Sequence, residues 1–233
     1  MRLAASGARV IGPGHLQDGV VNQDAMGVYG VSQGWCIAVC DGLGSRRLSH
    51  IGSSKAVRLV KQHARQAFAV SAQTLGQAIR LSWLEHFGTR YRDYETTCLW
   101  ARVDARGRGQ AGQVGDGLLL LKSRGAFRVV SAARQGFGNQ TDTLAQAGEG
   151  LWQTCEFELV LPGDGVLLMT DGISDDLIPE QLEPFFDVVY RRLARSNRRR
   201  MRTWLEREMH AWSTPLHGDD KSIAGIFRTD HKQ

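Results

Sequence analysis

Short apolar runs recur along the chain, and Gly-containing turns separate most of them. Runs of this length with such boundaries are typical of β-strands. The predicted strands are Ala8–Ile11, Ala25–Val31, Trp35–Cys40, Thr97–Val103, Gln110–Val114, Leu118–Leu121, Phe127–Val130, Trp152–Leu161, Val166–Thr170 and Ser222–Phe227. Because most of them are joined by short turns, we expect them to pair antiparallel.

Two blocks of helical periodicity interrupt the strands. The first has apolar stripes at Val57, Val60, Ala64 and Phe68 and at Leu75, Ile79, Trp83 and Phe87, and the second has stripes at Phe186, Val189 and Leu193 and at Leu205, Met209 and Trp212. Each block predicts a pair of amphipathic helices. Strands grouped before and after helix pairs, without strict alternation, indicate an α+β fold in which helices cover two antiparallel sheets.

The composition is that of an ordinary soluble protein, with 42% hydrophobic and 23% charged residues. The sequence contains no Pro/Ser-rich linker, low-complexity stretch or evident repeat, which favours a single domain over residues 1–233. No stretch approaches the ~18 to 20 apolar residues of a membrane span. The first residues contain one Arg and lack the apolar core of a signal peptide, so we expect a cytoplasmic protein.

Cysteine and histidine spacing gives no sign of zinc binding or disulfides. No C-x-x-C pair occurs among the cysteines, which are Cys36, Cys40, Cys98 and Cys155. They lie in apolar segments, where Cys usually packs as a small hydrophobic residue. No H-E-x-x-H pair is present, and His50, His63 and His86 fall within the expected helices. We therefore expect packing or surface roles for most of these side chains.

Positive charge is concentrated near the C-terminus of a chain whose formal net charge is +5. The arginines of segment 191–202 are Arg191, Arg192, Arg195, Arg198, Arg199, Arg200 and Arg202. We expect one surface helix whose apolar stripe packs on the fold while the guanidinium groups face water. Such a patch could dock an acidic or phosphorylated partner. No aromatic residue interrupts Arg198 to Arg202, so the stacking partners of a single-strand nucleic-acid binder are absent there.

Acidic residues stand where apolar strands end or begin. Asp41, Asp116 and Asp171 each precede a Gly beside an apolar run, and the pair Asp219 and Asp220 comes just before the last predicted strand. An ionised carboxylate at such a place is unfavourable unless a cation compensates its charge. Asp-Gly is also a common turn dipeptide, which is the alternative explanation for each pair taken singly. As a set, the pairs predict a carboxylate metal site in which separate segments converge at one sheet edge.

The acidic motifs also follow a specific order along the chain. They are NQDA at 22–25, VCDGLGS at 39–45, ETT at 95–97, VGDG at 114–117, MTDGISD at 169–175 and DDKS at 219–222. In this order, from Gly14 to Phe227, the sequence resembles the PP2C-type metal-dependent serine/threonine protein phosphatases, in the compact form of bacterial members. The resemblance implies a four-layer α-β-β-α sandwich, with two antiparallel sheets flanked by helices.

The resemblance further implies a role for the motifs that follow the apolar runs. Asp41 would bridge two divalent ions, and the backbone carbonyl of Gly42 would bind the second of them. Asp171 and Asp219 would complete the protein ligands of the first ion. Asp41, Asp171 and Asp219 together would form the catalytic set.

Two further acidic positions complete the implied site. Asp24, in the NQD motif, would bind a metal-coordinated water, and Asp116 matches the position of a third, more weakly held ion. Oxygen ligands of this kind suit Mg²⁺ or Mn²⁺ rather than zinc. Two such ions can acidify a bridging water, which would attack phosphorus in line without a covalent enzyme intermediate.

The implied activity is hydrolysis of phosphoserine or phosphothreonine in proteins. Such a hydrolase would act in signalling, on phosphoproteins that are targets of a serine/threonine kinase. A thiol-based mechanism is not indicated, because the chain has no C-x5-R motif. The alternative is a PP2C-like regulatory binding module with weak or no catalysis. The intact set of carboxylates favours the enzyme over this module.

Two features depart from the family pattern. Leu43 stands where many eukaryotic members have a His that is proposed to protonate the leaving group. That role would then fall to water or to another residue, of which His15 and His50 are the candidates. Gly19, Val20 and Val21 occupy the stretch that usually contains a phosphate-binding Arg. Phosphate affinity would then rest mainly on the metals.

Segment 132–150 is where a mobile flap is expected. Its Gly, Asn and Thr content fits a surface loop. Asn139 and Thr141 resemble an N-x-T of compact bacterial relatives, although turn formation explains these residues equally well.

Overall fold

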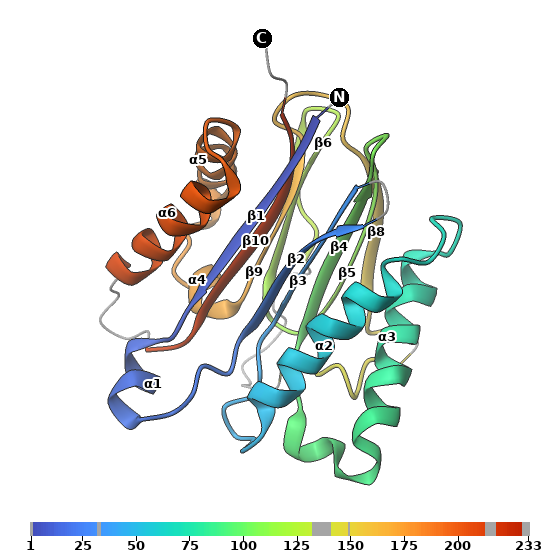
Figure 1. The fold of residues 1–233 in the computed structure, drawn as a ribbon, viewed down its shortest axis with the longest axis vertical. Helices are drawn as coiled ribbons and strands as arrows, with labels where there is room; N and C mark the ends of the chain where they lie inside the picture. The colour runs from blue at the N-terminus through green and yellow to red at the C-terminus, as the bar shows by residue number, and fades with distance from the viewer. Residues whose placement is uncertain (1, 32–33, 132–140, 149, 213–217, 230–233) are drawn as a thin grey trace.

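Two antiparallel sheets pack face to face, and helices cover the outer face of each (Figure 1). The computed structural model describes residues 2–31, 34–131, 141–148, 150–212 and 218–229. The layers follow the order helix, sheet, sheet, helix, which confirms the predicted α+β fold with two antiparallel sheets flanked by helices. Within these residues no helix is long and apolar enough to cross a membrane.

Each sheet has five strands among the described residues. The first sheet has the order β1 (Arg2–Val10), β10 (Lys221–Thr229), β9 (Gly165–Met169), β6 (Leu118–Ser123) and β7 (Ala126–Val129). The second has the order β2 (Ala25–Val31), β3 (Gly34–Cys40), β4 (Cys98–Asp104), β5 (Arg108–Val114) and β8 (Gln153–Glu158). All neighbouring strands pair antiparallel, as predicted.

The long helices form the two outer layers. Helices α2 (Ser49–His63) and α3 (Ala72–Phe87) cover the second sheet, and α5 (Leu182–Ala194) and α6 (Arg198–Ala211) cover the first. The shorter elements are α1 (Pro13–Asp18), η1 (Gly88–Tyr94), α4 (Asp171–Ser174) and η2 (Pro179–Gln181). Periodicity predicted the four long helices. It did not predict α1 or α4, because one or two turns are too short to show a stripe.

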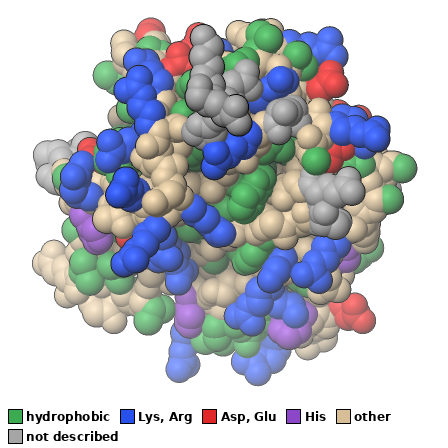
Figure 2. Space-filling view, turned by 45° about the horizontal axis from the view of Figure 1, so that its top comes forward, with side chains coloured by type: hydrophobic (Ala, Val, Ile, Leu, Met, Phe, Trp, Pro, Cys, Tyr) green, Lys and Arg blue, Asp and Glu red, His purple; other side chains and the backbone are tan. Residues whose placement is uncertain are grey.

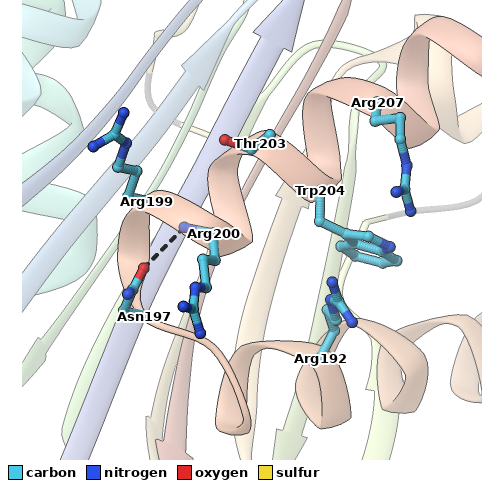
Figure 3. A pocket seen from close by; sticks show the side chains of 7 residues that line it. All are labelled: Arg192, Asn197, Arg199, Arg200, Thr203, Trp204 and Arg207. Atoms are coloured by element: carbon cyan, nitrogen blue, oxygen red, sulfur yellow. Dashed lines mark hydrogen bonds between the residues drawn. The ribbon is translucent and has the colours of Figure 1, made fainter.

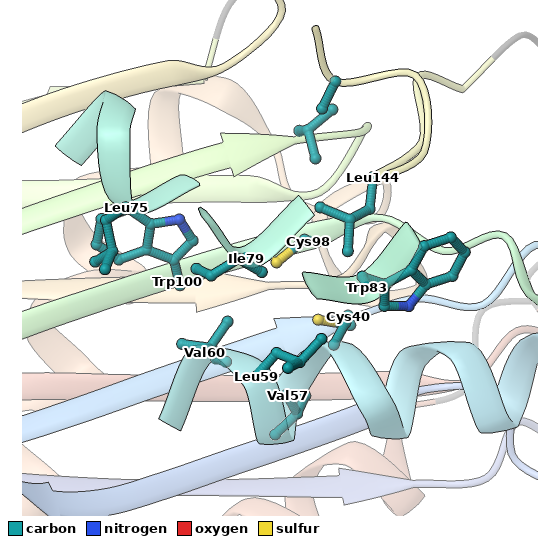
Figure 4. Close-up of a cluster of buried hydrophobic side chains, with 14 of the residues drawn as sticks. Cys40, Val57, Leu59, Val60, Leu75, Ile79, Trp83, Cys98, Trp100 and Leu144 are labelled. Atoms are coloured by element: carbon teal, nitrogen blue, oxygen red, sulfur yellow. The ribbon is translucent and has the colours of Figure 1, made fainter. Parts of the chain in front are cut away.

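Strand β3 shows why the central runs are apolar at almost every position. Ile37 and Val39 face the first sheet and lie in the core between the two sheets. Cys36, Ala38 and Cys40 face the other way and pack under α2 and α3, in the cluster drawn in Figure 4. Because successive residues of a strand point to opposite faces, a strand covered on both faces needs apolar residues throughout.

Strand β1 is longer than the sequence predicted. It begins at Arg2 rather than near Ala8, because β10 pairs with it from Arg2 opposite Thr229 to Val10 opposite Lys221. The first residues are rich in small side chains and have no strong strand preference of their own. The other strands lie where they were predicted, with shifts at their ends.

Three predicted helical positions lie outside their helices: Ala64 and Phe68 follow α2, and Trp212 follows α6. Helix α2 ends at His63, and Phe68 lies in the turn that follows. The buried guanidinium of Arg102 donates hydrogen bonds to carbonyl oxygens of this turn, namely those of Ala64, Gln66, Ala67 and Val70. It also lies 4.4 Å from the centre of the Phe68 ring. Carbonyl groups that are satisfied by a side chain need no further helical turn, so the helix ends here.

The Arg-rich segment forms parts of two helices rather than the one helix predicted. Arg191 and Arg192 lie in the last turn of α5, and α6 begins at Arg198. Asn197 has an extended backbone, and its side chain accepts a hydrogen bond from the backbone N–H of Arg200 at 2.9 Å. Asn is a favourable residue for capping a helix N-terminus, and this cap separates α6 from α5.

The apolar stripe of α6 packs on the first sheet through Met201, Leu205 and Met209, as predicted. The arginines of segment 191–202 are exposed, also as predicted. Arg198 differs from the others, because its Nη2 donates a hydrogen bond to the carbonyl oxygen of Val28 at 2.7 Å. Its side chain therefore joins α6 to the second sheet instead of facing only water.

Candidate active site

Four of the predicted acidic residues meet at one end of the sandwich. Asp41 follows β3 and Asp116 follows β5, both in the second sheet, whereas Asp171 follows β9 and Asp219 precedes β10 in the first sheet. The expectation of a single sheet edge was therefore wrong in detail. The carboxylates converge because the two packed sheets end at the same level, and each sheet contributes two of them.

A cavity of about 270 Å³ lies at this end of the molecule. Its lining residues are His15, Gln23, Asp41, Gly42, Leu43, Gly44, Ser45, Thr97, Asp116, Thr141, Asp171 and Asp219. Carboxylate oxygens of Asp41, Asp116 and Asp171 lie within 4.8 Å of one another. Among the described residues no Lys or Arg lines the cavity, so His15 is the one side chain of this described lining that could carry a positive charge beside the four carboxylates.

The protonation of these carboxyls reflects their crowding. Burial raises the pKa of Asp41 well above its ordinary value, and neighbouring carboxylates, Asp24 and Asp171 foremost, raise it further. Burial, followed by repulsion from Asp116 and Asp219, raises the pKa of Asp171 to about 6. One oxygen of Asp171, Oδ1, is buried and accepts no hydrogen bond from the described part of the chain. Both facts fit a site whose charge is balanced by a cation.

Asp24 lies behind the lining residues rather than among them. It is 1% exposed, and its Oδ2 accepts a hydrogen bond from the Thr170 hydroxyl at 2.9 Å. Its Oδ1 is buried, and no described residue forms a hydrogen bond with it. Burial is the main cause that raises the pKa of Asp24 to about 8. Asp24 is thus part of the same acidic group, at greater depth than Asp41 and Asp171.

The ETT motif holds the backbone of Asp41 in place. The Asp41 N–H donates to the Thr97 hydroxyl at 2.9 Å, and the Asp41 carbonyl accepts from the Thr96 hydroxyl at 2.7 Å and from the Thr97 N–H at 2.8 Å. The Leu43 N–H donates to the Glu95 carbonyl at 3.0 Å. Glu95 itself accepts a hydrogen bond from Arg46 at 2.7 Å. The sequence placed this motif in the site but did not show that it orients Asp41.

Gly42 is required by close packing. A Cβ at this position would lie 2.7 Å from the carbonyl carbon of Ser49, at the start of α2. The Gly42 N–H donates to the Gln23 carbonyl at 3.2 Å, and the Ser53 hydroxyl donates to the same oxygen at 2.6 Å. The loop after Asp41 is therefore fixed against both α2 and the NQD segment, and its residues form one wall of the cavity.

The two residues of the Asp219–Asp220 pair have different roles. Asp219 lines the cavity. Asp220 is 1% exposed, and its carboxylate accepts hydrogen bonds from the backbone N–H groups of Gly12 at 2.7 Å and Gln23 at 2.6 Å. Its Oδ2 also lies 2.9 Å from His15 Nδ1. Asp220 is therefore occupied in joining three segments of the chain, whereas Asp219 remains available to the cavity.

His15 was only an alternative in the sequence, and the structure places it in the cavity wall. It lies on α1, and its side chain is 21% exposed. Nδ1 is held by Asp220, and Nε2 has no hydrogen-bond partner among the described residues. His50 does not line the cavity. Because α1 lacks a periodic signal, only the fold could distinguish these two histidines.

Thr141 also belongs to the site. Its hydroxyl donates a short hydrogen bond to Asp116 Oδ2, and it lines the cavity. The hypothesis of a flap over segment 132–150 stays largely untested, because residues 132–140, with Asn139, and residue 149 lie outside the described residues. The stretch from Gly19 to Val21 is exposed and brings no cation to the cavity.

Comparison with known proteins agrees with this geometry. The family model described as Protein phosphatase 2C matches residues 11–209. No curated protein sequence matches the chain.

Among solved structures, the chain resembles a bacterial serine phosphatase with 14% identity and a TM-score of 0.67, over 99% of this chain and 100% of that one. The catalytic domain of the serine/threonine protein phosphatase PstP, in complex with 2 manganese ions, has 16% identity and a TM-score of 0.64, over 98% and 99% of the two chains. RsbX in complex with magnesium has 15% identity and a TM-score of 0.62, over 97% and 94%. These structures share the fold, the family model spans most of the sequence, and the chain therefore belongs to the protein phosphatase 2C family.

Proposed function

We propose that this protein is a metal-dependent phosphatase that hydrolyses phosphoserine and phosphothreonine in proteins. The observation that carries the proposal is the cavity in which Asp41, Asp116, Asp171 and Asp219 meet without a described Lys or Arg in its wall. Family membership and the metal-bound relatives support it. Its substrates would be phosphoproteins that a serine/threonine kinase produces.

The lining residues fit Mn²⁺ or Mg²⁺. Asp41, the carbonyl of Gly42, Asp171 and Asp219 would hold two ions, Asp24 would act through a bound water, and Asp116 would serve a third ion. Carboxylate and carbonyl oxygens are the ligands that these hard cations prefer. The buried, unpartnered Oδ1 of Asp171 gives such an ion a ready ligand. Bound ions would lower the pKa of a water and neutralise phosphoryl oxygens.

The protein's own contribution is to hold its carboxylates in fixed positions. Asp41 is fixed through hydrogen bonds at both its N–H and its carbonyl, so its side chain projects from a rigid point. Asp219 is fixed through Asp220, whose carboxylate joins α1 and the NQD segment to the start of β10. Positioning of this kind reduces the reorganisation needed during reaction.

The leaving group also needs a proton. Hydrolysis of a serine or threonine phosphate breaks the bond between phosphorus and the side-chain oxygen, and that oxygen must be protonated to leave as an alcohol. Leu43 cannot supply a proton. We assign this role to Nε2 of His15, because the ring lines the cavity and Asp220 holds its other nitrogen.

The direct test is phosphate release from a phosphothreonine peptide and from p-nitrophenyl phosphate, in Mn²⁺, Mg²⁺ or excess EDTA. We expect turnover with either metal and none in EDTA. Asp93→Asn, at an exposed position in η1, is a suitable control for substitutions in the cavity. Undiminished turnover in EDTA would contradict the proposal. Metal binding without turnover of either substrate would favour a PP2C-like regulatory module instead.

A further inference from the structure

A groove between α5 and α6 is lined largely by arginines. It has a volume of about 480 Å³, and its lining residues are Arg192, Asn197, Arg199, Arg200, Thr203, Trp204 and Arg207. Figure 3 shows Trp204 with Arg192 beneath it and with Arg200 and Arg207 on either side, while Arg199 points away on the other side of α6. No described Asp or Glu lines the groove.

The positive charge of the groove is poorly compensated within the described part of the chain. Arg207 pairs with Glu208 at 2.7 Å, and the Arg192 guanidinium lies 5.5 Å from the centre of the Trp204 ring. Neither Arg192 nor Arg200 forms an ion pair with a described carboxylate. Figure 2 shows Lys and Arg side chains to be far more abundant than acidic ones on the face it presents. A groove of this kind attracts anions.

The groove is also firmly built. Met201, Leu205 and Met209 anchor α6 to the first sheet, so the polar face of the helix is the face that lines the groove. The cap at Asn197 fixes the first turn of α6, and the positive end of the helix dipole adds to the attraction for an anion there. Because the helix backbone is already ordered, binding a partner costs entropy mainly in the exposed arginine side chains.

The groove is separate from the acidic cavity. Arg198, at the start of α6, bonds to Val28 and lies 5.8 Å from the ring of Trp35, which is near the beginning of β3. Asp41 follows the end of the same strand. A strand rises by about 3.3 Å per residue, so the start of α6 lies roughly 20 Å from Asp41. The groove and the acidic cavity have no described lining residue in common, so we expect a ligand in the groove to lie apart from the reacting phosphate.

We propose that this groove docks an acidic segment of the phosphoprotein substrate, at a distance from the phosphorylated residue. This inference rests on the proposed function. Carboxylates of the segment would meet the guanidinium groups of Arg192, Arg200 and Arg207, and Trp204 would provide an apolar floor for the peptide backbone and methylene groups. Docking would raise the local concentration of the phosphorylated residue at the cavity.

Two other anionic partners fit the groove less well. A single-stranded nucleic acid needs successive aromatic platforms, whereas Trp204 is the one aromatic residue among the described residues that line this groove. A membrane surface needs an apolar helix face to insert, and the apolar face of α6 is buried on the sheet. An acidic peptide requires neither feature.

The test uses two phosphothreonine peptides that differ only in their tails. One carries a run of Asp after a flexible Gly/Ser spacer, and the other carries Asn in place of Asp. A spacer of about ten residues can bridge roughly 20 Å, whereas one of about three residues cannot. We expect the long-spacer Asp peptide to have a KM about fivefold lower at low salt, from a few weak exposed ion pairs. The kcat should be the same for both peptides.

The groove variant is Arg192→Ser, Arg200→Ser and Arg207→Ser together. The matched control is Arg65→Ser, Arg106→Ser and Arg128→Ser, which removes the same charge from exposed positions outside the groove. We expect the groove variant to lose the preference for the Asp tail and to keep its turnover of p-nitrophenyl phosphate. The control variant should keep both. The melting temperature of each variant reports whether it is folded.

Several outcomes would overturn the docking proposal. These are equal KM values for the two tails in the unsubstituted protein, an unchanged preference in the groove variant, and an equal loss in both variants. If neither peptide is hydrolysed, the proposed function fails, and fluorescence anisotropy with the same labelled peptides and variants still tests the groove. Binding of a single-stranded oligonucleotide or of anionic vesicles that depends on the groove, without any effect on the Asp peptide, would assign it to another partner.

Discussion

Two groups of like charge in this protein are held in opposite ways. The carboxylates of Asp41, Asp171 and Asp24 come from strands and loops that are packed from several sides, and burial and mutual repulsion raise their pKa values. The guanidinium groups of the α5–α6 groove lie on exposed helix faces, where water solvates each of them. The buried carboxylates therefore need a counterion, whereas the exposed guanidinium groups remain charged without a partner because water solvates them.

The buried cluster should be sensitive to the loss of a single charge. Asp41→Asn removes the carboxylate that is placed to serve two ions, and we expect turnover to fall by about a thousandfold or more, since metals supply several kcal/mol of transition-state stabilisation. Calorimetry should show weaker Mn²⁺ binding in the same variant. Asp171→Asn and Asp219→Asn should reduce turnover almost as much, whereas the control Asp93→Asn should leave turnover unchanged. Near-normal activity and metal affinity in Asp41→Asn would remove the cavity from the mechanism.

Substitution of His15 tests whether a side chain of the cavity protonates the leaving group. His15→Asn should reduce kcat for the phosphothreonine peptide by about a hundredfold, the usual range for general acid catalysis. Hydrolysis of p-nitrophenyl phosphate should change little, because p-nitrophenolate leaves without protonation. A merely structural role would affect both substrates alike. His210→Asn, at an exposed position in the last turn of α6, is the control.

Substitution of Asp116 tests whether this residue serves the proposed third ion or the two more tightly held ions. Asp116→Ala should reduce turnover by about tenfold, the lower end of what groups supporting a metal site contribute, while leaving the tighter metal sites intact. Titration with Mn²⁺ followed by calorimetry measures this directly. Loss of both tight sites would show that Asp116 belongs to the centre and not to a third ion.

The metal-free protein should be most stable in mild acid. A carboxyl with a raised folded-state pKa stabilises the fold below its unfolded pKa near 4, and this contribution disappears as the pH rises through the folded value. For Asp171 and Asp24 those values are about 6 and about 8. In EDTA, the melting temperature should therefore fall between about pH 4 and pH 8. Asp24→Asn should flatten this dependence. A slope that is the same in Asp24→Asn would contradict the assignment.

Mn²⁺ provides the complementary measurement. Cations bind to the ionised carboxylates, so added Mn²⁺ should raise the melting temperature more at pH 8 than at pH 5. A shift of the same size at both pH values would mean that the ion binds elsewhere.

The exposed cluster should show the smallest and most salt-sensitive effect. Raising NaCl from about 0.05 to 0.5 M shortens the screening length several-fold. The ratio of the KM values of the Asn-tailed and Asp-tailed peptides should therefore fall towards one. Hydrolysis of p-nitrophenyl phosphate should respond far less. A preference that survives high salt would point to apolar contacts at Trp204 rather than to charge.

Much of the fold could be predicted from local pattern, because the apolar residues of each central strand show which of its faces are buried. Strand β3 is apolar at successive positions since both of its faces are covered, and α3 shows its buried stripe for the same reason. The acidic motifs could be found in the same way, because several Asp residues beside apolar runs are unusual as a set, although each Asp-Gly pair alone is a common turn. The five acidic residues of the predicted site form one group at the end of the sandwich, with Gly42 in the cavity wall beside Asp41, whereas the roles of all six residues towards metals stay proposals.

Contacts between distant segments decided the rest. The full length of β1 depends on β10, and the end of α2 depends on the carbonyls that Arg102 satisfies. His15 meets Asp220 across 205 positions of sequence, and this contact separates a structural Asp220 from an available Asp219. Periodicity describes one element at a time and contains no information on which distant residue will complete a hydrogen bond. The acidic residues could therefore be found from the sequence. Which of them line the cavity and which join segments of the chain was decided by tertiary packing.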